Sequence, residues 1–307
     1  MYKLCHYCNT ESPLYFHSKD YNSRVTKETF EHYRCPKCKL LFIDPLPANL
    51  GNYYPNNYHS MPKSIEQLQK VSEIDHYKID AVQRFSNNGA LLEIGPSFGG
   101  FCYLAKKAGF EVDAIEMDLR CCKFLNEVVG INTIHSDDPV NALQNEKAYD
   151  VIVLWHVIEH LSNLWKILDI AYKRLKPGGI IALATPNPDA FQFKILGRFW
   201  PHLDAPRHVM LVPIKLLSEK LQSLGMTAEL ITTNDSGSRN LNEFGWHYFF
   251  FSWYYFFLRS FTKKKGKKVV RKIGNLVTRF FSSIEETEWK KSDFKEESLN
   301  KEKFPFI

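Results

Sequence analysis

The fold of this chain is decided by the stretch Leu91-Leu92-Glu93-Ile94-Gly95-Pro96-Ser97-Phe98-Gly99-Gly100-Phe101. The apolar run that ends at Ile94 predicts a buried strand, the glycines predict a turn, and residues 101–108 have the spacing of a helix. Glycine has no Cβ, so this turn lets a ligand approach the backbone closely. Because open α/β sheets bind ligands beyond the carboxyl ends of their strands, we expect a binding site at this loop.

Short apolar runs alternate with helical patterns along the middle of the chain. They predict a leading helix over 64–85 and strands at 90–94, 111–116, 131–135, 150–154, 179–185 and 227–233. This alternation predicts an α/β fold with a doubly wound, mostly parallel sheet. No convincing further strand follows near the C-terminus, because Phe304-Pro305-Phe306-Ile307 is short and interrupted by proline.

Further motifs follow the first strand in a fixed order. The second strand ends at Glu116, 23 positions after Glu93. The later motifs are Tyr149 to Leu161, Leu175 to Gly179, Pro186-Asn187 and Pro206 to Val209. In this order they resemble the class I S-adenosylmethionine-dependent methyltransferases, in the branch that modifies quinones and sugars, over residues 64–235. One departure is Ser97, which stands where the first motif of that family has its central glycine.

The resemblance implies a Rossmann-like domain and S-adenosylmethionine as the cofactor. It places Glu116 on the two ribose hydroxyls, to which a carboxylate offers paired acceptors. Glu93 would contact the methionine end of the cofactor or instead brace the loop. Asp137 or Asp138 would contact the adenine amine or instead cap the following helix. The cofactor-binding candidates are Glu93, Gly95, Ser97, Gly99, Glu116, Asp137 and Trp155.

Methyl transfer to oxygen or nitrogen needs an aligned nucleophile and a nearby base. Histidine titrates in the useful range, and His208 is our first candidate for the base. His156, at the end of the fourth strand, is the second catalytic candidate, whereas His160 is expected to be structural. The loop 200–208, which also carries His202, would form a wall for the acceptor or, alternatively, an ordinary hydrogen-bonded lid.

Four cysteines near the N-terminus have metal-ligand spacing. Two C-x-x-C pairs, Cys5 with Cys8 and Cys35 with Cys38, supply the soft ligands that a tetrahedral Zn²⁺ prefers. So short a segment buries little core, so we expect a zinc ribbon with a structural Zn²⁺. The other three cysteines, Cys102, Cys121 and Cys122, are expected to be apolar fillers.

The net charge of +6 is local. Residues 262–279 hold eight Lys and Arg and no acid, so the remaining residues sum to −2. We therefore expect no nucleic-acid partner. With no export signal at the N-terminus, the protein is expected to be cytoplasmic, with reduced or metal-bound thiols.

An aromatic run over 246–258 precedes this basic stretch. It is too short for the ~20 residues of a spanning helix. Two interpretations remain. Residues 246–279 lie on an anionic membrane surface, on the inner face of the membrane, or the aromatic helix packs on the core and roofs the acceptor pocket.

The expected organisation has five parts. They are a zinc ribbon (1–48), a connector with the leading helix (49–88), an S-adenosylmethionine-binding core (89–235), an aromatic and basic helical extension (236–284) and a mobile tail (285–307). The expected function is methyl transfer to a small-molecule, saccharide or lipid-linked (glycolipid) acceptor, at oxygen. The alternatives are a ribosomal RNA methyltransferase and a non-catalytic binding protein of the same fold.

Overall fold

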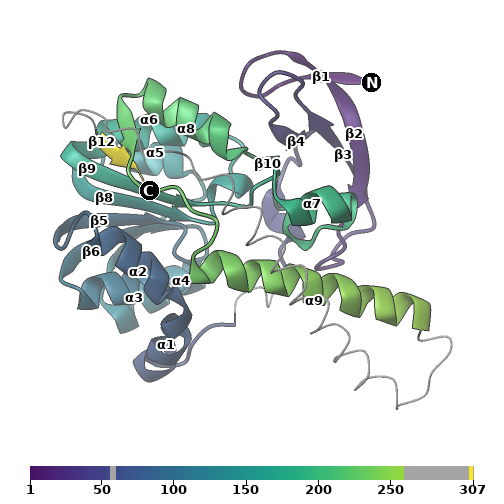
Figure 1. Cartoon of the computed structure of the whole chain (residues 1–307). Helices are drawn as coiled ribbons and strands as arrows, with labels where there is room; N and C mark the ends of the chain where they lie inside the picture. The colour runs from purple at the N-terminus through teal and green to yellow at the C-terminus, as the bar shows by residue number, and fades with distance from the viewer. Residues whose placement is uncertain (56–59, 259–303, 307) are drawn as a thin grey trace.

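The computed structural model describes residues 1–55, 60–258 and 304–306, and the side chains of 1–55 and 60–250. A seven-stranded sheet and a five-stranded sheet lie side by side (Figure 1). The larger sheet contains the glycine loop that the sequence singled out. The smaller one contains the two cysteine pairs.

All strand pairs of the larger sheet are parallel, in the order β11-β12-β9-β8-β5-β6-β7. This confirms the predicted doubly wound sheet. The strands are β5 Gly89–Ile94, β6 Phe110–Glu116, β7 Asn132–His135, β8 Tyr149–Trp155, β9 Leu175–Ala184, β11 Met226–Ala228 and β12 Phe304–Phe306. The last predicted strand, 227–233, is therefore much shorter than expected.

The two faces of this sheet are covered by different helices, because successive side chains of a strand point to opposite faces. Leu91 and Val151 pack with helices α1–α3, whereas Leu92 and Ile152 pack with α5, α6 and α8. The helices are α1 Ile65–Ser72, α2 His76–Gln83, α3 Gly100–Lys107, α4 Leu119–Phe124, α5 Pro139–Gln144, α6 Leu164–Arg174, α7 Phe191–Leu196, α8 Ile214–Ser223 and α9 Ser236–Leu258. The single leading helix predicted over 64–85 is divided into α1 and α2 by the short turn Glu73–Asp75.

The strand β12 corrects an expectation. Residues 304–306 were expected to belong to a mobile tail, but they lie between β9 and β11 in the sheet. Proline lacks one backbone donor, and successive residues of a strand bond to opposite neighbours, so one Pro305 removes only one ladder bond. The rest of the expected tail, 285–303 and 307, lies outside the described residues.

The smaller sheet joins the N-terminal segment to the rest of the protein. It has the order β1-β2-β3-β4-β10, and the strands are β1 Tyr2–Leu4, β2 Glu11–Lys19, β3 Thr29–Arg34, β4 Leu41–Ile43 and β10 Met210–Leu211. Met210 pairs with Phe42, and Leu211 pairs with Leu41. The last strand of the ribbon sheet is thus supplied by the segment that follows the predicted acceptor loop.

Helix α9 begins beside the larger sheet and extends along the outside of the molecule (Figure 1). Trp246 is buried in a cluster that also contains Phe193, Trp200 and Leu41. Among the residues that the structure describes, no helix has the length and hydropathy needed to cross a bilayer. Residues 259–284 of the predicted extension lie outside the described residues.

Candidate functional site

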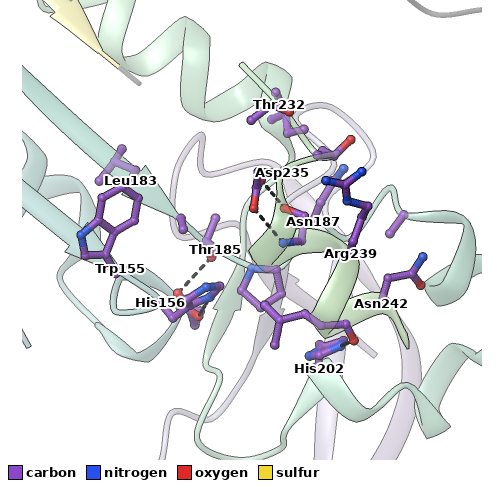
Figure 2. A pocket seen from close by; sticks show the side chains of 18 of the residues that line it. Trp155, His156, Leu183, Thr185, Asn187, His202, Thr232, Asp235, Arg239 and Asn242 are labelled. Carbon is purple, nitrogen blue, oxygen red and sulfur yellow. Dashed lines mark hydrogen bonds and ion pairs between the residues drawn. The ribbon is translucent and has the colours of Figure 1, made fainter. Parts of the chain in front are cut away.

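A cavity of about 980 Å³ lies beyond the carboxyl ends of β5, β8 and β9. Gly95, Ser97, Trp155 and His156 line it from the strand ends. The 200–208 loop and the first turns of α9 close the other side, where Figure 2 shows His202, Arg239 and Asn242. Such a volume is at the upper end of small-ligand sites and has room for a cofactor and a small acceptor.

The glycine loop has the geometry that its sequence requires. Gly95 and Gly99 have φ of +71° and +84°. A Cβ on Gly95 would lie 2.7 Å from Val157, and one on Gly99 would lie 2.3 Å from Leu125. Ser97 also adopts the left-handed conformation, with φ +55°, which explains why the family pattern has glycine there.

Glu116 holds this loop from the neighbouring strand. Its Oε2 accepts from the backbone N–H of Ser97 at 2.9 Å, and its Oε1 accepts from that of Asp118 at 2.8 Å. The side chain is 5% exposed, and burial raises its pKa despite these bonds. Glu116 thus lies directly behind the glycine loop and not among the residues that line the cavity.

Glu93 and Asp137 do not line the cavity in the described structure. The Cys102 thiol of α3 donates to Glu93 Oε2 at 2.9 Å, which is a bracing contact, and burial raises the pKa of Glu93 to about 7. Asp137 is exposed. Its neighbour Asp138 caps α5 by accepting from the backbone N–H of Val140 and Asn141.

Four histidines line the cavity: His156, His160, His202 and His208. His156, His160 and His208 lie around the fully buried Glu159, whose Oε1 lies 3.8 Å from His156 Nδ1 and whose Oε2 accepts from Thr185 Oγ1 at 3.0 Å. Burial alone would raise the pKa of Glu159. The interactions with His156, His208 and His160 outweigh it and lower this pKa to about 2.

His208 is held in one tautomer. Its Nδ1 lies 2.8 Å from the carbonyl oxygen of His202, so Nδ1 carries a hydrogen, and in the neutral ring the lone pair is on Nε2. Burial lowers the pKa of both His160 and His202 to about 4, which leaves these two rings neutral. The ligand atoms of Glu159, His160 and His208 lie within 4.8 Å of one another, so this set can also accept a cation.

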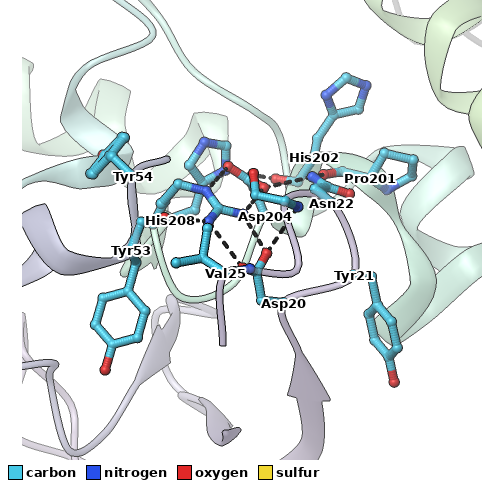
Figure 3. A network of polar contacts seen from close by, with 12 residues as sticks. Asp20, Tyr21, Asn22, Val25, Tyr53, Tyr54, Pro201, His202, Asp204 and His208 are labelled. Carbon is cyan, nitrogen blue, oxygen red and sulfur yellow. Dashed lines mark hydrogen bonds and ion pairs between the residues drawn. The ribbon is translucent and has the colours of Figure 1, made fainter. Parts of the chain in front are cut away.

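The loop that carries His208 is fixed by a buried ion network (Figure 3). Arg207 Nη2 lies 2.6 Å from Asp20 Oδ1 and 2.7 Å from Asp204 Oδ1, and its Nη1 donates to the Tyr53 carbonyl at 2.8 Å. Arg207 and Asp20 side chains are 0% exposed. Sequence reasoning missed Asp20 and its neighbour Asn22, because nothing in the ribbon sequence indicates which loop will meet the core.

The four N-terminal cysteine sulfurs form a compact cluster. The Sγ distances are 3.5 Å for Cys5 to Cys38, 3.5 Å for Cys8 to Cys35 and 3.7 Å for Cys8 to Cys38. Sulfurs about 2.3 Å from a tetrahedral Zn²⁺ lie about 3.8 Å apart, so the cluster fits this ion. Burial raises the pKa of Cys5, so binding of a cation there would have to remove the proton of its thiol.

Each cysteine pair sits in a turn of the same geometry. Asn9 and Lys39 follow the two pairs with φ of +54° and +63°. Their backbone N–H groups donate to the carbonyls of Cys5 and Cys35, each at 3.0 Å. The repeated turn brings both pairs of sulfurs to one point.

Comparison with known proteins gives a match to the core. A family model described as a methyltransferase domain matches residues 67–230, which is more than half of the chain. A ubiquinone biosynthesis O-methyltransferase of Rickettsia prowazekii (strain Madrid E) is 23% identical over 149 residues, covering 41% of this chain and 59% of that protein. One from Rickettsia bellii (strain OSU 85-389) is 29% identical over 129 residues, covering 39% and 53%. The chain thus spans between half and two thirds of the length of these curated relatives.

Solved structures of similar architecture include a SAM-dependent methyltransferase from Archaeoglobus fulgidus. It has 24% identity and a TM-score of 0.44, and the match covers 52% of this chain and 69% of that one. A possible histamine N-methyltransferase from Thermotoga maritima has 16% identity and a TM-score of 0.43, covering 53% and 76%.

Proposed function

Because the chain belongs to the methyltransferase-domain family, we propose that it transfers a methyl group from S-adenosylmethionine to an oxygen atom of a small-molecule, saccharide or lipid-linked acceptor. The observation that carries this proposal is the cavity that Gly95, Ser97 and Trp155 line together with four histidines. The proposed cofactor loop and the candidate base therefore line the same cavity.

S-adenosylmethionine supplies a methyl group activated by a sulfonium charge. The backbone at Gly95 and Ser97 would approach the cofactor closely, and Trp155 would form an apolar side of its pocket. Glu116 would bind the ribose hydroxyls through lone pairs that remain after its two backbone bonds. Gly99 acts indirectly, because it lets α3 begin immediately behind the loop.

His208 is the proposed general base. Its Nε2 lone pair would take the proton of the acceptor hydroxyl as the oxygen gains the methyl group. The buried carboxylate of Glu159 stabilises the imidazolium that forms, since opposite charges at short range favour the charged state of both groups. His156, which contacts the same carboxylate at the end of β8, would orient the acceptor.

We also propose that the cysteine cluster holds one structural Zn²⁺ through Cys5, Cys8, Cys35 and Cys38. The spacing of the four sulfurs and their paired turns support this. Metal analysis of protein purified without chelator should give one zinc per chain, and a metal-free, fully folded ribbon would refute the assignment.

An anionic membrane surface is a proposed partner for the C-terminal extension. Its support is the order of the sequence, in which the aromatic part of α9 is followed by the basic residues 263–279. The first turns of α9 line the cavity, so the same helix would bring a lipid-linked acceptor to the site.

The experiment that tests the activity is methyl transfer measured with a panel of probes. Suitable members are 3,4-dihydroxybenzoate, a nucleotide-linked hexose and a lipid-linked hexose, with S-adenosylhomocysteine as the measured product. His208→Gln should lower turnover by a factor of about 10² to 10⁴ without changing S-adenosylmethionine affinity. His76→Gln, on the exposed side of α2, is the matched control. Equal turnover of both variants would remove His208 from the reaction.

A further inference from the structure

The ribbon contributes a residue to the cavity that the methyltransferase domain cannot supply by itself. Asn22, in the loop 20–25 between β2 and β3, lines the cavity beside Pro201, His202 and Asp204. Figure 3 shows this loop reaching the segment that carries His208. Two parts of the chain about 180 residues apart thus form one wall.

Asn22 is oriented by two hydrogen bonds. Its Nδ2 donates to the Pro201 carbonyl at 2.7 Å and to Asp204 Oδ1 at 2.6 Å. Both amide hydrogens are used, so the amide oxygen is left to accept. Among the described residues, no donor to this oxygen is found, and the side chain is half-buried at the cavity.

The loop that carries Asn22 is itself held rigidly. Asp20 accepts from the backbone N–H of Ser23 at 3.1 Å and of Val25 at 2.8 Å while it pairs with Arg207. Arg207 also binds Asp204, so one guanidinium fixes the ribbon loop and the acceptor loop against each other. A planar, fixed set of donors suits this double contact.

The backbone continues the same connection. Ile43 of β4 donates its N–H to the carbonyl of Val209 at 2.9 Å, next to His208. The contacts between the ribbon and residues 199–211 therefore lie on the acceptor side of the cavity and not at the glycine loop of residues 95–100.

We propose that the ribbon loop 20–25 is a wall of the acceptor pocket, and that Asn22 accepts a hydrogen bond from an acceptor hydroxyl next to the one that is methylated. This rests on the proposed function. The acceptor class is then a molecule with neighbouring hydroxyl groups, one read by Asn22 and one deprotonated by His208. A polar group built to bind a hydroxyl discriminates strongly against an analogue that lacks it.

The test compares Asn22→Ala with Ser23→Ala, a neighbour in the same loop that does not line the cavity. Each variant is assayed with the panel member that the wild type methylates and with its analogue lacking one neighbouring hydroxyl. 3,4-Dihydroxybenzoate is paired with 4-hydroxybenzoate, and the linked hexose is paired with a deoxyhexose. Asn22→Ala should lower kcat/KM for the hydroxylated probe about tenfold, mainly through KM, the cost of about one hydrogen bond. The ratio of kcat/KM for the hydroxylated probe to kcat/KM for its analogue should fall by the same factor. The affinity for S-adenosylmethionine should not change.

An unchanged preference in Asn22→Ala would overturn the recognition role. A second arm needs no acceptor. In Asp20→Asn, hydrogen exchange of peptides from 199–211 should accelerate, while peptides from 91–118 keep the wild-type rate. If the peptides from 199–211 exchange at the wild-type rate in Asp20→Asn, the proposal that the ribbon loop forms this wall is wrong. If no probe is methylated by the wild type, the proposed function fails, and this exchange result still decides whether the ribbon holds the acceptor loop.

Discussion

The backbone N–H of Ser97 donates to Oε2 of Glu116 at 2.9 Å and so joins the glycine loop to the end of the neighbouring strand. This carboxylate shapes the loop through its bonds to the backbone of Ser97 and Asp118, and we propose that it also binds the ribose of the cofactor.

Replacing Glu116 by Ala should weaken S-adenosylmethionine binding by about 1 to 3 kcal/mol, the scale of losing hydrogen bonds to a charged group. Calorimetry measures this directly. Glu111→Ala, at an exposed position of the same strand, is the control and should bind normally. Unchanged affinity in Glu116→Ala would move the ribose contact to another residue.

Ser97→Gly should be tolerated, whereas Gly95→Ala should not. The left-handed conformation costs a residue with a Cβ about 1 to 2 kcal/mol, and glycine removes that strain at a smaller cost in unfolded-state entropy. At Gly95 the same strain is joined by a contact of 2.7 Å with Val157. Denaturant unfolding should show equal or higher stability for Ser97→Gly and a loss of more than about 1 kcal/mol for Gly95→Ala.

Glu93 should contribute to the way in which the free energy of unfolding depends on pH. Burial raises its folded-state pKa from 4.5 to about 7, so the folded protein binds more protons than the unfolded chain between these values. Stability from this group is therefore present below pH 4.5 and falls as pH rises towards 7, by roughly 3 kcal/mol. Glu93→Gln, which still accepts from Cys102, should gain stability over the wild type at pH 8 but not at pH 4. A gain independent of pH would contradict this origin.

Added Ni²⁺ should inhibit methyl transfer if His208 acts as the base. The ligand atoms of Glu159, His160 and His208 converge within 4.8 Å, so an ion there would bind a ring nitrogen of His208. Turnover measured against Ni²⁺ concentration should fall, and a chelator too weak to remove zinc from the proposed ribbon site should restore it. Stimulation by Ni²⁺ would argue for a metal-assisted reaction instead.

Binding to anionic vesicles should depend on the basic stretch. Replacing Lys263, Lys264, Lys265, Lys267 and Lys268 by Gln removes about 1 kcal/mol per cation near the surface. Sedimentation with phosphatidylserine vesicles should lose the protein on this change and at high salt, because such attraction is screened within about 8 Å at physiological ionic strength. If the full-length protein does not bind the vesicles at low salt, the membrane proposal is wrong, and the remaining interpretation is that α9 covers the acceptor pocket.

Local sequence predicted the features that local physics determines. The glycine loop, the parallel strands and the paired cysteines each follow from residues close together in the chain. Residues 304–306 were missed because a three-residue strand carries little pattern, and only its neighbours β9 and β11 select it. Glu116 lies at the end of β6, as the sequence predicts, and its contact with ribose stays a prediction. Asp137 does not line the cavity, and its neighbour Asp138 caps α5.

The union of ribbon and core was beyond sequence reasoning for a different reason. Asp20 and Arg207 are 187 positions apart in the sequence, and the residues around them do not indicate that the two form a pair. A buried charge is costly without an opposite charge beside it, but the packing of the two sheets decides which acid lies beside which cation. The contact between the loop 20–25 and the loop 200–208 is therefore visible only in the structure.

The most direct test of the central claim is calorimetric titration of S-adenosylmethionine into the wild type and into Gly95→Ala, with NAD as the competing nucleotide. We expect one saturable site in the wild type, no displacement by NAD and strongly reduced binding in the variant, because a Cβ at residue 95 distorts the loop that would hold the cofactor. Tight binding of NAD with no binding of S-adenosylmethionine would contradict it.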